Sequence, residues 1–373
     1  MRVLQISGNL EVESGGPTRS TLGIAGSITD CKPFQHELII IGRVDNLAKD
    51  ILKQKKIKYL ILRNTIFSAY NALLIRLPKL ILEIRRSDVI IVNGFFLFSN
   101  LIVAFFKKFK TRFIVVPHGS LENYEKNQGP IRKKIFIQFM QLSGLSNFEL
   151  VVASKLEAEN LITPFASFKV TVIPYGTELP VLRRKKNLSL EHLNLVSLNR
   201  ITDKKRIDIS IRIIDLLNRR GISASLDIIG SGNPRLQSSL VALAHELEIL
   251  HKVKFHGLLY GGALENVLSK MDILLLPSEN ENFANSVPEC IVRDIPVVIS
   301  SYTGISDFVA TNSCGIVINS LEPETYVDGI VRLMEQIENY RNNCANSRTL
   351  LTWERASLEW SKLLSNKVNE SNA

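Results

Sequence analysis

The sequence predicts an α/β protein made of two doubly wound domains in tandem, each with a parallel sheet covered by helices. The chain has 373 residues, which is more than one hydrophobic core usually supports. Short apolar runs rich in Val and Ile alternate with helix-length segments. Strands that are apolar throughout are typical of a parallel sheet buried on both faces. We therefore expect ligands to bind at the carboxyl ends of the strands.

The first predicted domain covers residues 1–180 and the second covers residues 191–345, with a basic linker between them. The predicted strands of the first domain are Arg2–Ser7, Glu37–Ile41, Lys58–Leu62, Asp88–Val92, Arg112–Val116, Leu150–Ala153 and Val170–Ile173. Those of the second are Leu193–Leu198, Ser225–Ile229, Val253–His256, Asp272–Leu276, Pro296–Ile299 and Gly315–Ile318. Predicted helices include Asp208–Arg220, Pro234–Leu250 and Pro323–Tyr340. We expect residues 346–373 to form a helix that packs back toward the first domain, anchored by Trp353 and Trp360.

An aromatic stretch from Val89 to Phe106, followed by a basic run at 107–112, approaches the length of a membrane span. Asn93, Gly94 and Asn100 interrupt it, so a strand, a turn and a buried helix are predicted instead. The alternative is a shallow peripheral contact, in which aromatic side chains enter an anionic membrane surface and lysines meet its headgroups.

The composition limits the cellular compartments and the binding partners that we expect for this chain. The net charge of +10, with basic runs at 107–112, 132–134 and 183–186, leaves nucleic acid, an anionic membrane and a phosphorylated substrate open. Four widely spaced cysteines exclude a zinc knuckle or a disulfide framework and indicate a reducing compartment. The first residues form a strand too short for the apolar core of a signal peptide. We expect a cytoplasmic protein, with peripheral contact on the inner face of the cell membrane as the alternative.

The strongest candidate site follows the predicted strand Asp272–Leu276. Glu281 lies on the loop that leaves this strand, and Glu289 lies in a helix expected to begin near Asn285 or Ser286. Free amides at that helix start form an anion site. A loop carboxylate, a row of amides and a helix carboxylate match the order sugar, pyrophosphate and ribose in a nucleotide sugar. By spacing alone, the simpler interpretation is that Glu281 is a solvated loop residue and that Glu289 stabilises the helix dipole.

A second candidate cluster is cationic. Arg200 leaves the first strand of the second domain, and Lys205 lies five residues later at a helix entrance. Two cations at the switch point of a sheet are suited to neutralise a pyrophosphate leaving group. The neighbouring Lys204 and Arg206 are interpreted as a basic surface turn.

Two turns of the first domain complete the candidates. The Gly15–Gly16 pair lets the backbone approach a phosphate, although such a pair is more often only a turn. His118 follows a buried strand and precedes Gly119, a better position for a ligand than most structural histidines occupy. The sequence contains no G-x-G-x-x-G, P-loop or D-x-D motif and no carboxylates or histidines at metal-ligand spacing. A dehydrogenase, an NTPase and a divalent metal are therefore not indicated.

Together these segments resemble glycosyltransferase family four, retaining enzymes of the GT-B fold, in which two doubly wound Rossmann-like domains face a central cleft. The resemblance runs from the Gly15–Gly16 turn to beyond Gly315 and covers nearly the whole chain. Its specific part is the E-x7-E element from Glu281 to Glu289. The supporting motifs follow in the expected order: Pro117–Glu122, Ile173–Gly176 and the spacing from Arg200 to Lys205.

Five positions depart from the usual family pattern. Ala284 stands where glycine is common, Arg206 where glycine follows the lysine, and Tyr175 where asparagine precedes glycine. Asn93 stands where histidine is frequent, and Thr303–Gly304 stands in place of a second Gly-Gly. Ala284 is expected to narrow the sugar pocket. The departures therefore bear on the choice of donor more than on the class of enzyme.

The resemblance implies a role for each site residue. The implied catalytic residues are His118, Arg200, Lys205 and Glu281, and the implied donor-binding residues are Gly15, Gly16, Phe283, Ala284, Asn285 and Glu289. The two cations bind the departing diphosphate, Glu289 binds the ribose, and Glu281 binds the sugar with the amides of Phe283 and Ala284. Gly16 closes over the phosphates, and His118 contacts the sugar near the reacting carbon. No metal or other cofactor is implied.

The predicted activity is transfer of a sugar from a nucleotide-diphosphate sugar to a saccharide in surface polysaccharide biosynthesis, such as that of lipopolysaccharide or exopolysaccharide. The basic first domain and its aromatic stretch favour a lipid-linked acceptor. Two alternatives stay open: a nucleotide-sugar-processing enzyme such as a 2-epimerase, and a non-catalytic nucleotide-sugar-binding protein. Nucleic-acid binding is not expected.

Overall fold

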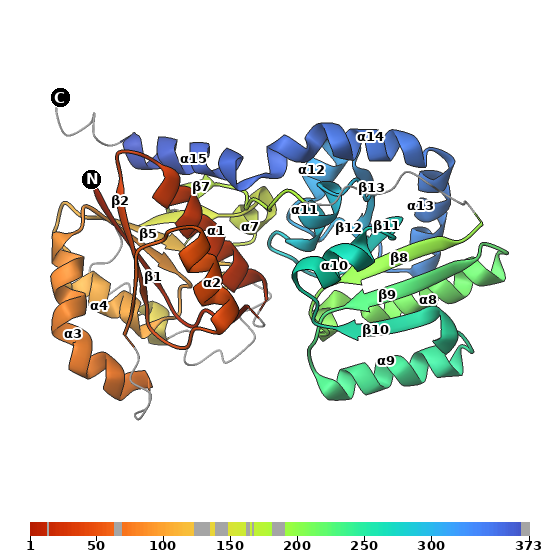
Figure 1. The fold of residues 1–373 in the computed structure, drawn as a ribbon, viewed down its shortest axis with the longest axis horizontal. Coiled ribbons are helices and arrows are strands. Elements are labelled where there is room, and N and C mark those ends of the chain that lie inside the picture. The colour runs from red at the N-terminus through yellow and green to blue at the C-terminus, as the bar shows by residue number, and fades with distance from the viewer. Residues whose placement is uncertain are drawn as a thin grey trace. The chain divides into compact units, whose positions relative to one another are not determined.

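The protein is described by a computed structural model that covers residues 1–12, 15–62, 69–122, 135–138, 148–161, 165, 168–180 and 191–366. The chain divides into two compact units: unit 1 is Met1–Gly176 with Trp353–Ala373, and unit 2 is Thr177–Thr352. The sequence predicts that the first domain ends at residue 180 and that the second covers residues 191–345. The structure also assigns residues 177–180 and 346–352 to unit 2. Each unit is a parallel sheet with helices, as the sequence predicts (Figure 1).

Unit 1 has a seven-stranded parallel sheet in the order β3-β2-β1-β4-β5-β6-β7. Its strands are β1 (Arg2–Ser7), β2 (Gln35–Ile40), β3 (Tyr59–Ile61), β4 (Val89–Asn93), β5 (Arg112–Val116), β6 (Glu149–Val152) and β7 (Val170–Val172). Its helices are α1 (Gly16–Asp30), α2 (Asn46–Gln54), α3 (Ala69–Arg86), α4 (Phe98–Phe106), α7 (Lys155–Glu159) and α15 (Trp353–Ser365). Helix α1 packs against α2 and α15, and α3 packs against α4.

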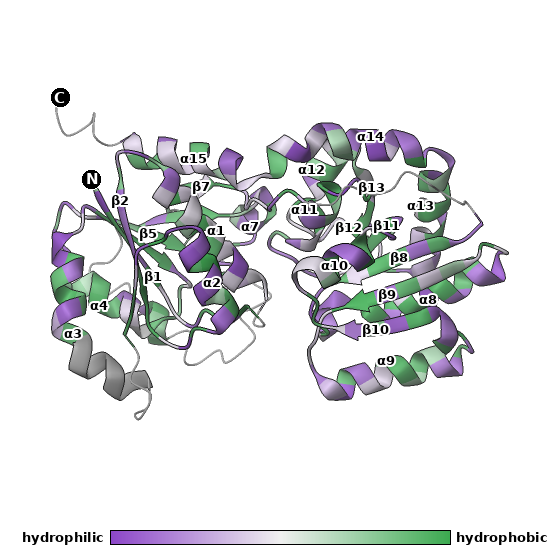
Figure 2. Cartoon of the chain, viewed as in Figure 1, coloured by the Kyte–Doolittle hydropathy of each residue, from purple (hydrophilic) through white to green (hydrophobic). Residues whose placement is uncertain are grey.

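Unit 2 has a six-stranded parallel sheet in the order β10-β9-β8-β11-β12-β13. Its strands are β8 (Leu193–Leu198), β9 (Ala224–Ile229), β10 (Val253–Gly257), β11 (Ile273–Leu276), β12 (Val297–Ser300) and β13 (Gly315–Ile318). Its helices are α8 (Ile207–Arg219), α9 (Pro234–Glu246), α10 (Gly261–Leu268), α11 (Ser286–Ile291), α12 (Ser306–Thr311), α13 (Pro323–Glu335) and α14 (Ile337–Ser347). The central strands are mainly hydrophobic, whereas α14 is largely hydrophilic (Figure 2).

The strand order places one switch point in each sheet. In unit 1 the chain moves outward from β1 to β2 and β3 and then returns to β4 on the other side of β1. In unit 2 it moves from β8 to β9 and β10 and returns to β11 beside β8. Loops that leave neighbouring strands in opposite directions form a crevice at the carboxyl edge. The segments after β8 and β11 therefore meet at such a point.

The aromatic stretch forms a strand, a turn and a helix, namely β4, a turn and α4, as predicted, but α4 is only partly buried, with Phe105 62% exposed. Phe95 is fully buried and packs edge-on against Phe96, Phe136 and Phe165, with ring centroids 5.1, 5.6 and 5.0 Å away. Edge-to-face pairs of this kind add to the free energy of burial. Within the described ranges, no helix has both the length and the hydropathy needed to cross a bilayer.

Two helices end earlier in the structure than the sequence predicts. Helix α9 ends at Glu246 rather than residue 250, and Glu248 has a φ of 59°, which a continuing α-helix does not allow. The predicted helix Pro323–Tyr340 divides at Gln336 into α13 and α14. Gln336 has a φ of −131°, outside the helical region. Hydrophobic periodicity continues across both breaks and does not reveal them.

Helix α15 belongs to unit 1 through its contacts with α1. A Cβ atom added to Gly23 of α1 would lie 1.9 Å from the indole of Trp353, so only glycine leaves room for that ring. Trp360 is almost completely buried, and Arg112 of β5 donates to the carbonyl oxygen of Leu363 across 3.0 Å. Unit 2 is inserted between residues 176 and 353 of unit 1, and its two ends meet where the Thr177 amide donates to the carbonyl oxygen of Leu351 across 2.7 Å.

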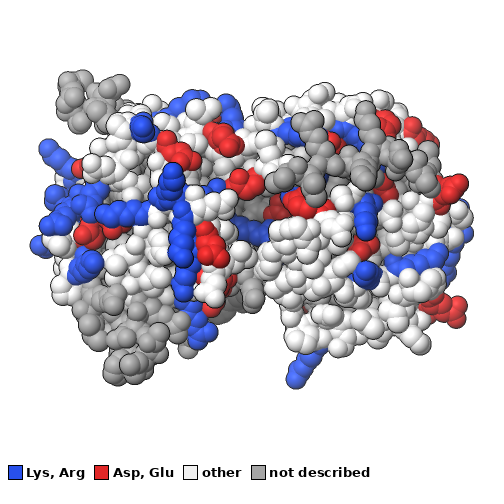
Figure 3. Space-filling view, viewed as in Figure 1, with Lys and Arg blue, Asp and Glu red and all other residues white. Residues whose placement is uncertain are grey.

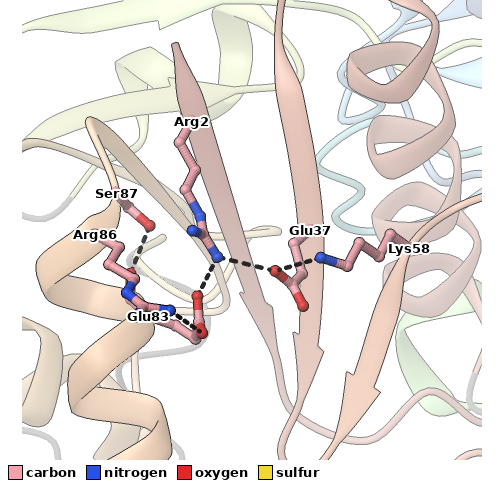
Figure 4. A network of polar contacts seen from close by, with 6 residues as sticks. All are labelled: Arg2, Glu37, Lys58, Glu83, Arg86 and Ser87. Atoms are coloured by element: carbon pink, nitrogen blue, oxygen red, sulfur yellow. Dashed lines mark hydrogen bonds and ion pairs between the residues drawn. The ribbon is translucent and has the colours of Figure 1, made fainter.

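The amino ends of the unit 1 strands are joined by an ion-pair network (Figure 4). Arg2 at the start of β1 contacts Glu83 of α3 and lies 3.2 Å from Glu37 of β2, which also pairs with Lys58. The Glu37 and Glu83 side chains are 15% and 10% exposed, so these pairs are less screened by water than ordinary surface pairs. This edge of the sheet is opposite to the edge that carries the candidate site, so we infer that the network stabilises the fold and takes no part in ligand binding.

Candidate active site

The structure brings Lys205 and Glu281 of unit 2 into direct contact. Lys205 ends a short 3-10 turn (Asp203–Lys205) after β8, and Glu281 lies on the loop after β11. The lysine Nζ is in ion-pair contact with Oε1 of Glu281, and the two side chains are only 12% and 8% exposed. The contact is an ion pair, in which Oε1 accepts no regular hydrogen bond from a described residue.

Burial lowers the pKa of Lys205, and the charge and contact of Glu281 oppose that effect. The positive charges of Lys204 and Arg200 lower the pKa of Lys205 further, so Arg200 acts on the same site. Arg200 is exposed and forms no ion pair with any residue that the structure describes. The turn therefore presents one buried, paired cation and one exposed cation, an arrangement suited to an anionic ligand.

Two main-chain contacts fix the loop that carries Glu281. The Glu281 amide donates to the carbonyl oxygen of Tyr302 across 3.0 Å, and the Gly304 amide donates to that of Glu281 across 2.8 Å. Glu281 and Thr303 form a parallel bridge. The Thr303–Gly304 segment thus holds the Glu281 backbone, although it departs from the family pattern.

Arg206 joins the turn after β8 to the loop after β11. Its guanidinium lies 2.9 Å from Glu279 and makes two hydrogen bonds, of 3.0 and 2.9 Å, to Asp208. These two partners raise its pKa against the effect of burial. The interpretation of Arg206 as part of a simple basic surface turn is therefore incomplete, because the side chain crosses to the other loop. Arg206 also has a φ of 47°, the left-handed conformation that explains why glycine is usual here.

The predicted helix start after β11 is correct, because α11 begins at Ser286 with Asn285 as its preceding cap. Phe283 and Ala284 are buried in the loop before it, whereas Asn285 and Glu289 are partly exposed. Ala284 has a φ of 68°, so it keeps the backbone conformation of the usual glycine while adding a methyl group.

Sequence reasoning missed two glycines that position Arg200. Gly230 and Gly232 follow β9, and a Cβ atom on them would lie 1.9 Å from the carbonyl oxygen of Asn199 and 2.1 Å from that of Ile201. Ile201 also bridges to Gly232. The G-x-G spacing directly after a strand is the signal that indicates such a close backbone approach.

In unit 1 the candidate residues lie at the carboxyl edge of its sheet. Gly15 is the cap of α1, with φ 88° and ψ −143°, a conformation open to glycine, and Gly16 is the first helical residue. His118 follows β5 and has a φ of 52°, and Gly119 follows with 79°. Glu13 and Ser14, which belong to the same predicted turn as Gly15, lie outside the described residues.

Both ring nitrogens of His118 are engaged. Nδ1 lies 2.7 Å from the hydroxyl of Tyr175, and Nε2 lies 3.3 Å from Oδ1 of Asn93. Burial lowers the pKa of His118 to about 4, so the ring is neutral at pH 7. Burial and the charges of Glu157 and Glu122 raise the pKa of Tyr175, which keeps its hydroxyl protonated.

Glu157 fixes the backbone beside His118, and sequence reasoning missed it. Its carboxylate accepts from the amides of Gly119, at 2.6 Å, and Ala153, at 2.8 Å, and its side chain is fully buried. Ser154 and Glu157 form the S-x-x-E spacing of a helix capping box, and Ser154 accepts from the Glu157 amide. That spacing is the signal that marks the start of α7.

Among the described residues, no three His, Cys, Asp or Glu side chains are grouped so that they could hold a metal ion.

The predicted site residues are divided between the two units. His118, Gly15 and Gly16 belong to unit 1, and the remaining predicted residues belong to unit 2.

Comparison with known proteins agrees with this fold. Residues 180–349, nearly all of unit 2, match the family described as "Glycosyl transferases group 1". The chain is 22% identical over 371 residues to a GDP-mannose-dependent alpha-(1-6)-phosphatidylinositol dimannoside mannosyltransferase of Mycobacterium tuberculosis, with 95% of this chain and 94% of that protein covered. The fold is similar to that of Anabaena Alr3699/HepE solved with UDP, with a TM-score of 0.76, 15% identity and coverage of 98% and 100%. The lipopolysaccharide outer core galactosyltransferase WaaB has a TM-score of 0.71, 16% identity and the same coverage.

These matches define the class of protein: a transferase enzyme with the GT-B fold. The chain is a glycosyltransferase.

Proposed function

We propose that the protein is a retaining glycosyltransferase of family four that moves a sugar from a nucleotide-diphosphate sugar to a saccharide or lipid-linked saccharide in surface polysaccharide biosynthesis. The observation that carries the proposal is the buried contact between Lys205 and Glu281 at the switch point of unit 2, with Arg200 beside it. Ligands of doubly wound sheets bind at this edge. The names of the relatives support the donor class: one depends on GDP-mannose, and the Anabaena protein was solved with UDP.

In this proposal, Arg200 and Lys205 bind the donor diphosphate, and Glu289 binds the ribose hydroxyls. Glu281 and the amides of Phe283 and Ala284 bind the sugar. In the reaction the bond from the anomeric carbon to the diphosphate breaks, a bond to the acceptor oxygen forms on the same face, and a donor phosphate oxygen takes the acceptor's proton. Fixed cations stabilise the charge that develops on the diphosphate, so neither a metal nor another cofactor is proposed.

The test compares Lys205→Ala and Glu281→Ala with the matched control Lys204→Ala in transfer assays with a panel of nucleotide sugars. We expect each site variant to lose on the order of 100-fold or more in kcat/KM. The control changes the neighbouring lysine and should stay within a few-fold of wild type. Full activity in either site variant would contradict the assignment. Thermal shifts with nucleoside diphosphates then identify the base, because a ligand of the folded state raises its stability.

A lipid-linked acceptor would place the protein at a membrane, and we propose that unit 1 makes a peripheral contact there from the cytoplasmic side. Phe105 and Phe109 are 62% and 95% exposed at the end of α4, next to the exposed Lys108 and Lys110. Lys and Arg side chains gather on the face of unit 1 seen in Figure 3. Aromatic rings beside lysines suit an anionic interface. The basic runs 132–134 and 183–186 lie outside the described residues.

Vesicle sedimentation tests this contact. The wild-type protein should bind vesicles that contain anionic lipid and not neutral vesicles, and Phe109→Ser should weaken that binding. Leu358→Ser, which changes an exposed apolar residue of α15, is the matched control. Equal binding of the Phe109 variant and the wild type would exclude this surface.

A further inference from the structure

Asn93 and Tyr175, the two departures from the family pattern that lie in unit 1, both contact the side chain of His118. Asn93 is the last residue of β4 and Tyr175 follows β7, and each hydrogen-bonds one ring nitrogen of His118, which follows β5. Asn93 and Tyr175 are 5% and 6% exposed. Buried polar groups of this kind are rarely left unpaired, so their pairing constrains where protons lie.

The hydrogen bonds identify the tautomer of the ring. The side-chain amide of Asn93 donates from Nδ2 to the carbonyl oxygen of Ile6 across 3.4 Å, which leaves Oδ1 as the acceptor that faces His118. Nε2 of His118 must then carry the proton, because an amide oxygen cannot donate. Nδ1 is left with a lone pair and accepts the hydroxyl proton of Tyr175.

We propose that Tyr175 and Asn93 hold His118 as the neutral tautomer with its proton on Nε2, and that Tyr175 is a positioning residue that acts through this histidine. The charged groups around Tyr175 favour this direction of the bond. Burial and, to a smaller extent, the charges of Glu157 and Glu122 raise the pKa of Tyr175, so the phenol stays protonated and able to donate. Burial disfavours the imidazolium form of His118 in the same way.

The tautomer determines what the ring can offer a ligand. Nδ1 is occupied at 2.7 Å, whereas the Nε2 bond to Asn93 is longer, at 3.3 Å. The ring therefore offers an N–H donor at Nε2 and no free basic nitrogen. This part of the inference rests on the proposed function: if a nucleotide sugar binds here, His118 donates to an oxygen of the donor sugar and does not remove a proton.

Nitrogen-15 NMR of histidine-labelled, unliganded protein tests the tautomer directly. At pH 7 the wild type should show His118 with Nε2 protonated and Nδ1 unprotonated. Tyr175→Phe should give a mixture of both tautomers, because Nδ1 loses the hydroxyl group that donates to it. Tyr59→Phe removes a hydroxyl from β3 of the same unit and should leave the spectrum unchanged. A wild-type proton on Nδ1, or an unchanged tautomer ratio in Tyr175→Phe, would overturn the proposal.

Kinetics then separate positioning from the proposed function. With an identified donor, Tyr175→Phe should lower kcat/KM by about 10-fold, because rings in the other tautomer present no N–H at Nε2 to the donor sugar. Should Tyr175→Phe fold poorly, the wild-type spectrum alone still decides the tautomer. If no donor supports transfer, the proposed function fails while the spectrum stands. If transfer occurs with the wrong tautomer, only the positioning role fails.

Discussion

The main-chain amide of Glu279 donates a hydrogen bond to the carbonyl oxygen of Lys204 across 2.9 Å and joins the loop after β11 to the turn after β8. Lys205 is the residue after Lys204, and Glu281 lies two residues after Glu279. The link therefore sets the register in which their side chains meet. Arg206 reinforces it through Glu279.

A double-mutant cycle should show strong coupling between Lys205 and Glu281. Each of Lys205→Met and Glu281→Gln leaves a charge in a site where the side chains are 12% and 8% exposed, so each should cost about 2 kcal/mol in free energy of unfolding. The double variant should cost clearly less than the sum, because no unpaired charge remains. Urea unfolding of all four proteins measures the coupling, and additive losses would contradict the buried ion pair.

Arg206 should be replaced more easily by glycine than by alanine. Its φ of 47° is strained for any residue with a Cβ atom. Arg206→Gly relieves this strain while losing partly exposed ion pairs, so stability should change by no more than about 1 kcal/mol. Arg206→Ala loses the same pairs and keeps the strain, so it should be less stable than the glycine variant by about 1 kcal/mol. Equal stability of the two variants would argue against the left-handed conformation.

Ala284→Gly should stabilise unit 2 slightly, by up to about 1 kcal/mol, because its φ of 68° favours glycine. Ala242→Gly is the matched control in the middle of α9, where glycine should cost about 1 kcal/mol. Thermal unfolding compares the two. In transfer assays the smaller residue at position 284 should also widen the range of accepted donor sugars.

Gly230→Ala should disturb the Arg200 turn. The added methyl group would lie 1.9 Å from the carbonyl oxygen of Asn199, and the glycine φ of 144° is unfavourable for other residues. We expect a loss of at least about 2 kcal/mol in stability and weaker nucleotide binding. Gly262→Ala is the control, because a Cβ atom there meets nothing within 4 Å. Similar behaviour of both variants would show that the backbone approach is not tight.

Unit 1 should lose stability as the pH falls. Burial lowers the pKa of His36 from 6.5 to about 4, and the ring bridges Thr29 and Gln5 at 2.8 and 3.0 Å. Between pH 6.5 and about 4 the unfolded chain binds a proton that the folded chain excludes. The free energy of unfolding therefore decreases as the pH is lowered, by up to about 1.4 kcal/mol per pH unit. His36→Gln cannot titrate and should have a shallower slope between pH 6.5 and 4.5 in urea unfolding. An identical slope would show that His36 titrates normally.

The sequence predicted the strands well because most are buried on both faces and therefore apolar throughout. The sequence also placed Lys205 and Glu281 after two strands of the second domain and assigned both to one nucleotide-sugar site, but it did not indicate their direct contact. The ends of α9 and α13 were missed because they depend on backbone angles at Glu248 and Gln336 that side-chain hydropathy does not express.

The contacts of Arg206 and Tyr175 could not be read from the sequence for a different reason. Arg206 and Glu279 are 73 residues apart, and Tyr175 and His118 are 57 apart. Each contact depends on strand order and on the exact turn after a strand. Both residues stood out in the sequence as departures from a family pattern, but nothing in the sequence indicated their partners.

The insertion of unit 2 within unit 1 has a consequence for synthesis on the ribosome. Unit 2 is contiguous in the chain, so all of its strands emerge before α15 does. The Trp353 indole can pack against Gly23 of α1 only after that. The amino-terminal unit, although translated first, is therefore completed last, and its α1 surface stays open to chaperones or to misassociation during translation of the other unit.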